Sequence, residues 1–211
     1  MKIILTFLIL VNISFSQVKD IYEYGGLLTE RISRMNKEFI HNNPHGFADS
    51  VFSFALSLAD SNKSDALLFS AIAVMPFKDF KVSIPFVGFK LNLKFFNRVE
   101  EEIFKKKMEI LPSKIFDDSP ETEFGDKDKW VHFFISAFLS YHFGEAFADY
   151  FGLFVENFEE EFKVDGKVDL RDISINRNGA EFGKLLRCNF INPSVILAKE
   201  KALRYGENIN N

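Results

Sequence analysis

The sequence predicts a mainly α-helical protein with a single domain, and three observations lead to this prediction. Most of the chain carries apolar residues at intervals of three and four, which is the period of an amphipathic helix. One short stretch, residues 80–96, instead alternates apolar and polar residues as a β-hairpin does. A length of 211 residues is enough to build one sizeable hydrophobic core. We therefore expect a helical bundle with a small β-hairpin or extended crossover near residues 80–96.

The N-terminal part is expected to form a helical layer. Helical periodicity covers residues 18–40, 47–58 and 66–74, with a turn at 42–46. The first helix is interrupted or entered late at Gly25-Gly26, because glycine is unfavourable inside a helix. Ser64 suits the cap of the third helix, and Pro76 follows its end.

The remaining elements complete a domain organisation in three parts. Residues 97–111 return to helical periodicity, and residues 193–206 form a last helix with Pro193 in its first turn. Between them, residues 112–125 are acidic, contain two prolines and read as a linker. After a signal peptide at residues 1–16, one domain would extend over residues 17–211. It consists of an N-terminal layer with the hairpin (17–111), the linker (112–125) and a polar-motif half (126–206).

The amino-acid composition limits which classes of molecule we expect the protein to bind. The chain contains 27 phenylalanines but one tryptophan, so we expect a dense aromatic core or a surface that meets lipid. A biased genome composition would produce the same excess. The net charge is −4 and no basic tract occurs, which argues against nucleic acid as a partner.

The first sixteen residues predict export. Lys2 precedes an apolar stretch at residues 3–11, and Ser14 and Ser16 supply small side chains before Gln17. This is the pattern of a secretory signal peptide, which places the mature protein in the periplasm or outside the cell. No cysteine lies near the cleavage point to carry a lipid. Cys188 is the only cysteine, so no internal disulfide is possible, and we expect it to be buried as a small apolar residue.

Three polar clusters occur in the strongly apolar half of the chain, and the first is Asp128-Lys129-x-x-His132. Asp128 and His132 are one helical turn apart, so the carboxylate is placed to fix the imidazole tautomer. Asp128 also suits the N-terminus of a helix, where the helix dipole favours an anion. A helix cap followed by a core histidine explains the same residues without a site.

The second cluster follows along the same expected helix. His142, Glu145, Asp149, Gly152 and Glu156 fall on one side of that helix, opposite a phenylalanine-rich side. The stripe is either the solvent-facing side of an amphipathic helix or a set of metal ligands and acid–base groups. We favour the solvent-facing interpretation for the first acids, and Glu156 is the better candidate for a site.

The third cluster is Asp169-x-x-Asp172-x-x-x-Asn176-x-x-Gly179, followed by Gly183. On a helix these residues share one side, and two glycines four apart allow another helix to approach closely. The acids and the amide would then lie at a buried helix crossing. A turn with aspartate caps, followed by a helix that begins near residue 178, is the alternative.

Residues 126–187 resemble a known family. Asp128-Lys129-x-x-His132, the acidic helix around Glu156 and the Asp169-to-Gly179 pattern are similar to YfiM-like periplasmic lipoproteins, and the opening motif also resembles VanZ-like membrane proteins. The resemblance implies an envelope location and a shared polar site, but no reaction. The chain lacks the cysteine that carries the lipid in that lipoprotein family.

Residues 161–172 also overlay a calcium-binding EF-hand loop. Asp165, Gly166 and Asp169 match that pattern, but Lys163 occupies a ligand position and Asp172 replaces the usual glutamate. An Asp-Gly turn between two helices explains these residues more simply.

Two functional hypotheses from different classes follow. The first is a non-enzymatic envelope protein whose acidic–histidine network holds its helices together, with peripheral contact to a membrane surface or another envelope component. The second is a divalent-metal-binding protein or metal-dependent hydrolase in which the same polar side chains converge. In that case His132 would be a base or ligand. The candidate site consists of Asp128, His132, Glu156, Asp169 and Asp172, supported by Lys129, Asn176 and Gly179.

Overall fold

The computed structural model describes the chain from residue 18 to 199, except for residues 85–88, 95–98 and 163–169. The predicted signal peptide therefore lies outside the described residues, as do Asp169 and most of the EF-hand-like loop. The side chains of residues 18–20, 79–98 and 154–162 are likewise outside the description, so Glu156 is placed by its backbone alone.

The protein is a helical bundle, as predicted, and its N-terminal layer contains four helices among the described residues: α2 (Val18–Ser33), α3 (Lys37–Asn42), α4 (Pro44–Leu58) and α5 (Lys63–Val74). The predicted helix at 18–40 is thus two helices, because the Asn36 side chain caps a new helix by accepting from the Phe39 amide. The glycine pair does not interrupt α2. A side chain at Gly25 would lie 2.6 Å from Ile72 Cγ2, so glycine allows α2 to pack closely on α5.

Two asparagines, rather than the expected residues, begin the next two helices. The predicted turn at 42–46 is largely the first turn of α4, where Asn43 accepts from the Gly46 amide and Pro44 takes the first helical position. At α5 the cap is Asn62, which accepts from the amides of Ser64 and Asp65. An asparagine cap satisfies amides that have no partner within the helix, so Ser64 is free for another contact.

The hairpin is present, and the helix after it is shorter than expected. Strands β1 (Asp79–Ile84) and β2 (Phe89–Lys94) pair antiparallel, with Val82 opposite Leu91. Helix α6 (Glu101–Ile110) follows, and residues 99–100 are not helical. Within α6, Glu102 pairs with Lys106 at 2.7 Å, whereas Glu101 pairs with Lys78 beside the hairpin at 2.6 Å.

Residues 112–125 contain no helix or strand, but they are fastened to the bundle at both ends. The indole Nε1 of Trp130 donates to the Pro112 carbonyl over 3.0 Å. The fully buried Asp126 carboxylate accepts from the Ser119 hydroxyl and pairs with Arg171 at 3.2 Å. The segment is therefore a packed connection.

Three helices form the polar-motif half: α7 (Lys129–Phe143), α8 (Glu145–Phe162) and α9 (Leu170–Cys188). The continuous helix expected through the second polar cluster is wrong, because Gly144 has a φ of +90° and separates α7 from α8. The alternative in which a helix begins near residue 178 is also wrong, since α9 begins at Leu170. Residues 193–199 form the expected last helix, and its Ser194 amide donates to Asp49 Oδ1 over 2.7 Å.

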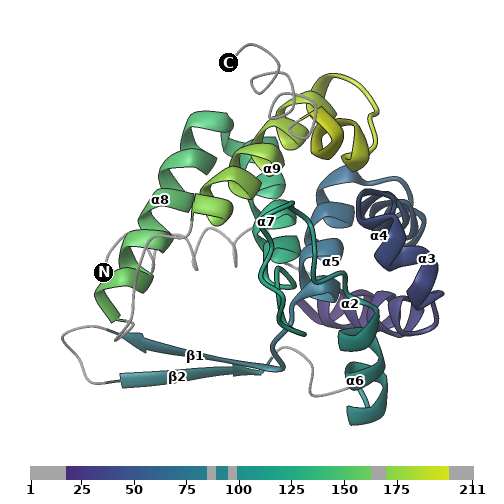
Figure 1. The fold of residues 1–211 in the computed structure, drawn as a ribbon. Coiled ribbons are helices and arrows are strands. Elements are labelled where there is room, and N and C mark those ends of the chain that lie inside the picture. The colour runs from purple at the N-terminus through teal and green to yellow at the C-terminus, as the bar shows by residue number, and fades with distance from the viewer. Residues whose placement is uncertain (1–17, 85–88, 95–98, 163–169, 200–211) are drawn as a thin grey trace.

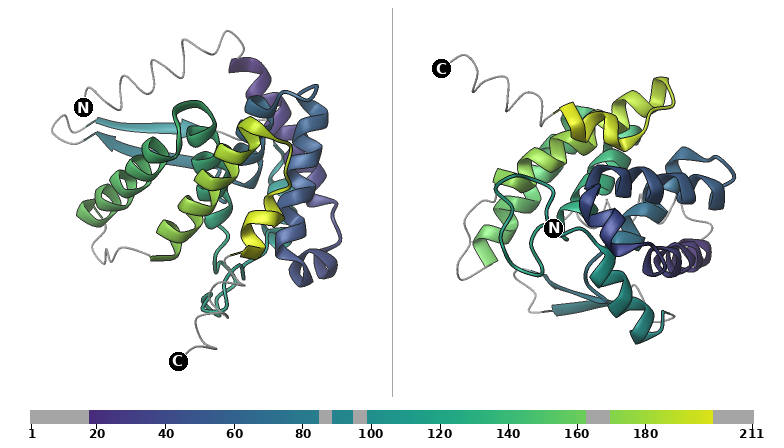
Figure 2. Two further views of the ribbon diagram at one scale, coloured as in Figure 1. Left: turned by 90° about the horizontal axis from the view of Figure 1, so that it is seen from above. Right: turned by 45° about the vertical axis from the view of Figure 1, so that its right-hand side comes forward.

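Helix α7 lies between the N-terminal layer and α9, whereas α8 lies at the margin of the molecule (Figure 1). Seen from above, α8 is on the opposite side from the N-terminal helices (Figure 2). Aromatic rings join the layers in the core: Phe47 meets Trp130 edge-on at 5.1 Å, and Phe182 stacks on Phe133 at 5.5 Å. Cys188 is exposed at the end of α9, so its predicted burial is wrong.

Candidate functional site

The candidate site lies where α7 crosses α9, and two glycines bring these helices together. A Cβ at Gly179 would lie 2.2 Å from the Phe133 carbonyl oxygen, and one at Gly183 would lie 2.1 Å from that of Ala137. Both contacts involve backbone, which cannot move aside as a side chain can. Any larger residue would therefore force the helices apart. The close crossing inferred from the glycine spacing is present.

Polar groups line the same crossing one to two turns away from the glycines. The Ser136 hydroxyl on α7 donates to Asn176 Oδ1 on α9 over 2.9 Å, and both residues are buried. The Asn176 amide group also faces α8, because a side chain at Gly152 would lie 3.0 Å from its Nδ2. Asn176 thus lies where all three helices meet. A buried amide with partners specifies one arrangement of the helices, since leaving it unpaired is costly.

At the N-terminal end of α7, three further side chains from two helices converge. Asp128, His132 and Asp172 each offer one ligand atom, and these atoms all lie within 4.8 Å of one another. The His132 Nε2 atom is 3.7 Å from Asp172 Oδ1. The side chains of Asp172, His132 and Asp128 are 11%, 19% and 27% exposed, so the cluster has limited contact with solvent.

Lys129 lies within this cluster and is more deeply buried than the acids. Its side chain is 4% exposed, and its ammonium group is 2.6 Å from Asp172 Oδ1 and 3.3 Å from Asp128 Oδ2. One cation therefore bridges two carboxylates. Asp128 was expected to cap α7, but its side chain makes no capping hydrogen bond. It serves the ion pair with Lys129 instead.

Burial and the neighbouring charges shift the pKa of the Asp172 carboxyl in opposite directions. Burial raises the pKa of the Asp172 carboxyl, and the neighbouring Asp128 raises it further. The nearby His132 and Lys129 side chains act in the opposite direction and lower it. The His132 and Lys129 side chains together offset part of the cost of placing two adjacent acids at a nearly closed helix crossing.

The second polar cluster does not join the first, and its acids lie at the edge of the α8–α9 contact, where the Glu145 side chain is 39% exposed. His142 belongs to α7, and its Nε2 lies 2.7 Å from the Ser64 hydroxyl of α5. On α8, Glu145 pairs with Lys184 of α9 at 2.7 Å, the Asp149 Oδ1 atom is buried, and Gly152 faces Asn176. The α8–α9 contact therefore combines a solvent-exposed ion pair with a small apolar cluster, in which Ala148 of α8 packs with Ala180 of α9 and Leu139 of α7.

Of the sequence-predicted site residues, the structure brings together Asp128, His132 and Asp172, with Lys129 between them. Glu156 belongs to α8, one turn beyond Gly152, and its side chain is outside the described residues. Asp169 directly precedes α9 and is outside the described residues.

Sequence reasoning did not find Ser136, Asp126 or Arg171. A spacing signal existed for Ser136, which lies one turn after His132 on the same side of α7. Arg171 immediately precedes the candidate residue Asp172 in the sequence. In the structure its guanidinium group pairs with the buried Asp126 carboxylate.

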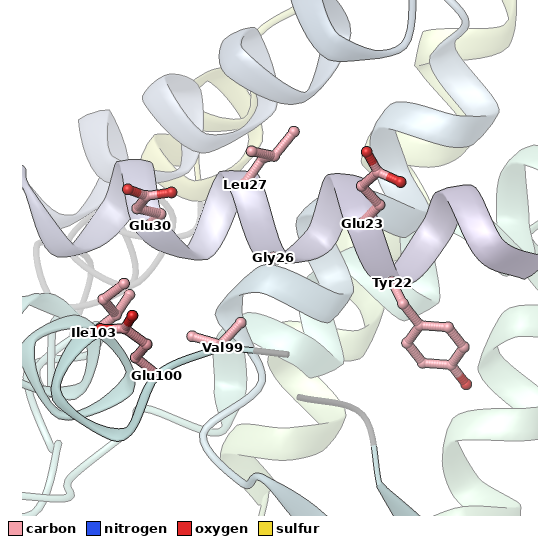
Figure 3. A pocket seen from close by; sticks show the side chains of 8 residues that line it. All are labelled: Tyr22, Glu23, Gly26, Leu27, Glu30, Val99, Glu100 and Ile103. Atoms are coloured by element: carbon pink, nitrogen blue, oxygen red, sulfur yellow. The ribbon is translucent and has the colours of Figure 1, made fainter. Parts of the chain in front are cut away.

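A groove of about 340 Å³ lies elsewhere, between α2 and the start of α6. Gly26, Leu27, Val99 and Ile103 give it apolar walls, and three glutamates border it (Figure 3). None of its lining residues belongs to the α7–α9 cluster, so the polar site and this groove are separate features.

Comparison with known proteins yields no relative: no family model, no curated protein and no solved structure matches the chain. The resemblance to YfiM-like and VanZ-like proteins therefore stays a prediction from short motifs. In the described part of the chain, no helix is both long enough and apolar enough to span a lipid bilayer.

Proposed function

We propose that this protein is a non-enzymatic helical protein of the bacterial cell envelope, in which the polar network between α7 and α9 fixes the arrangement of the bundle. The export part of this proposal rests on the signal-peptide pattern at residues 1–16. The resemblance of residues 126–187 to YfiM-like periplasmic proteins agrees with that location.

The observation that carries the structural role is the position of Lys129. The Lys129 side chain is 4% exposed, and its ammonium group between two carboxylates occupies the place where a catalytic cluster would need an open position for substrate or water. Breaking a buried pair by removing one partner is strongly destabilising. Together with Ser136–Asn176 and the two glycine contacts, the ion pair makes this crossing highly specific in geometry.

Divalent-cation binding at the same cluster is the second candidate, and one atom favours it. Asp128 Oδ1 is buried and has no hydrogen-bond partner among the described residues. Two carboxylates and an imidazole are donors that suit Mn²⁺, Fe²⁺ or Zn²⁺. The residues fit such an ion only if the Lys129 ammonium withdraws from the carboxylates, because both cations would compete for the same oxygens.

One experiment separates the two candidates. Thermal melts of the mature protein and of His132→Ala are measured with EDTA, MnCl₂ or ZnCl₂, and metal content is determined by elemental analysis. A structural network predicts melts that do not respond to metal or chelator, and a loss of about 1–2 kcal/mol for His132→Ala in every condition. His41→Ala, which alters an exposed histidine, is the matched control.

Metal binding predicts the reverse pattern. The wild-type melting temperature would rise with one of the metals, because a ligand that binds the folded state stabilises it. His132→Ala would abolish that rise. Full stability of His132→Ala together with a metal-dependent wild type would overturn the structural role.

A further inference from the structure

The groove between α2 and the start of α6 offers apolar walls to a ligand. Its volume of about 340 Å³ falls within the range of small-molecule sites, roughly 300–1,000 Å³. Two of its large apolar side chains, Tyr22 and Leu27, are 37% and 46% exposed. Gly26 leaves one wall without a side chain, since a Cβ there would lie 3.6 Å from Val99 Cγ2. The carbon atoms of a ligand can therefore pack against this groove.

The charged residues that line the groove are all acidic. Glu23 and Glu30 belong to α2, and Glu100 lies on the opposite wall beside Val99 (Figure 3). Among the lining residues that the structure describes there is no lysine, arginine or histidine. Glu100 occupies the N-cap position of α6, but its side chain makes no capping hydrogen bond. The groove thus presents negative charge that is not used to cap the adjacent helix.

Two of these carboxylates differ from the acids that follow them in α6. Glu101 and Glu102 each pair with a lysine, at 2.6 and 2.7 Å. Within the described part of the chain, neither Glu23 nor Glu100 forms an ion pair. Glu30 has an exposed arginine one turn further along the chain as its partner. Positive charge supplied by a ligand would therefore complement the groove.

The spacing of the carboxylates indicates the shape of that ligand. Glu23 and Glu30 are two turns apart on the same side of α2, which is about 10.5 Å along the axis at about 1.5 Å per residue. Among the described residues, the group of acids and histidines that is close enough to hold a metal ion lies at the α7–α9 crossing instead. A ligand for the groove needs several positive charges that are separated by apolar segments.

We propose that this groove binds a linear polyamine, with its methylene segments on the apolar walls and its ammonium groups beside the glutamates. In an extended triamine such as spermidine, the two outer ammonium groups are about as far apart as Glu23 and Glu30 are along α2. Glu100 faces the ligand from the opposite wall (Figure 3). One exposed ion pair contributes little, so binding depends on a single ligand that engages several carboxylates at once.

Isothermal titration calorimetry of the full mature protein tests the proposal with two trivalent cations. Spermidine carries its charges along an apolar chain, whereas hexaamminecobalt(III) carries the same charge on a compact ion. A compact ion cannot reach carboxylates two turns apart, and it has no methylene groups to place on the apolar walls. We expect spermidine to bind about tenfold more tightly than hexaamminecobalt(III).

Charge variants locate the binding. Glu23→Gln/Glu100→Gln should bind spermidine about tenfold more weakly than the wild type, because two of the three carboxylates are lost. Glu38→Gln/Glu123→Gln is the matched control, since it removes two exposed charges outside the groove and should bind as the wild type does.

An apolar variant tests the walls of the groove. Leu27→Ser should weaken spermidine binding severalfold, because the methylene segments lose an apolar contact. Thermal melts establish that each variant folds, and the altered side chains are exposed in every case.

Four results would overturn the proposal. The first three are a wild type that does not bind spermidine, equal binding of hexaamminecobalt(III), and a Glu23→Gln/Glu100→Gln variant that binds as well as the wild type. The fourth is a dimer in analytical ultracentrifugation that Leu27→Ser dissociates, which would assign the groove to a second copy of the chain. None of them bears on the α7–α9 network or on export, which the metal melts and cell fractionation test separately.

Discussion

Helix α9 packs against two partners and uses them differently. Toward α7 it presents glycines and polar groups that are enclosed, so that Ser136–Asn176 and the Lys129 ion pairs lie almost out of contact with water. Toward α8 it also presents polar groups, yet the Glu145–Lys184 pair is substantially exposed and α8 lies at the margin of the described part of the bundle. The two contacts share polar chemistry but differ in enclosure.

The difference teaches that the same polar residue types serve both contacts of α9, and that their enclosure is what distinguishes the two. Helices α4 and α5 meet apolar partners and bury Phe47, Val51, Leu67 and Val74. Helix α8 meets the Asn176 and Lys184 side of α9 and turns its carboxylates toward it. Enclosure then determines the cost of a substitution. Removing one partner of an exposed ion pair changes stability little, whereas removing one partner of a buried pair leaves an uncompensated charge and is strongly destabilising.

The largest expected effect on stability concerns the enclosed ion pairs of Lys129 between α7 and α9. Lys129→Met would leave Asp128 and Asp172 adjacent and without their shared cation, at a cost of about 3 kcal/mol in the free energy of unfolding at pH 7. The loss should shrink as the pH falls, because protonation removes the uncompensated charges. Urea denaturation at pH 7 and pH 5 measures both values.

The control for this prediction is Lys106→Met, which removes an exposed ion pair with Glu102. It should change stability by no more than about 0.5 kcal/mol. Equal effects of the two substitutions would show that enclosure does not distinguish these ion pairs.

The next effect concerns the glycine contact. Gly179→Ala would place a methyl group against the Phe133 carbonyl and should destabilise the protein by about 2 kcal/mol. Gly26→Ala in α2 is the matched control, because the nearest atom to its new methyl is Val99 Cγ2 at 3.6 Å. That control should gain about 0.5–1 kcal/mol from helix propensity. Two substitutions of the same kind should thus differ in sign in urea denaturation; matching signs would refute the close crossing.

The smallest expected effect on stability concerns Asp149, at the contact between α8 and α9, and it depends on pH. Burial raises the pKa of Asp149 above its ordinary 3.8, with a further increase from Glu145, while Arg177 lowers it. Between 3.8 and the raised value, the folded chain binds more protons than the unfolded chain, so stability falls as the pH rises. Asp149→Asn should therefore be more stable than the wild type at pH 7, by about 0.5 kcal/mol or less.

That advantage should vanish below the ordinary pKa of 3.8, where Asp149 is protonated in both states. Denaturation curves of the variant and the wild type between pH 3.5 and 7 give the comparison. The exposed Glu123→Gln should show no such gain at neutral pH. A variant less stable than the wild type at pH 7 would mean that the Asp149 charge is needed on this side of α9.

Local patterns allowed much of this fold to be predicted. Periodicity located the helices, the alternation at 80–96 located the hairpin, and the spacing of Gly179 and Gly183 indicated the close crossing. The predictions that failed concern features that depend on contacts with other segments of the chain. The break between α7 and α8 depends on how Gly144 is held between the two helices, and the exposure of Cys188 depends on where α9 leaves the core. Neither feature can be inferred from the local sequence alone.

The site shows the same division. The Asp128–His132 spacing is local and could be read directly, whereas the arrival of Asp172 from forty residues away required the crossing itself. Lys129 was expected to be a supporting residue, but its deep burial makes it the centre of the cluster. Sequence spacing cannot show which of two neighbouring charges points inward.

The single tryptophan gives this protein an optical consequence. Trp130 is fully buried, touches Phe47 of the N-terminal layer and donates to the Pro112 carbonyl. Light absorbed at 295 nm is therefore emitted from one residue at the seam between the two halves. The emission maximum and its quenching by iodide will report whether that seam is closed, in any variant, without an attached dye.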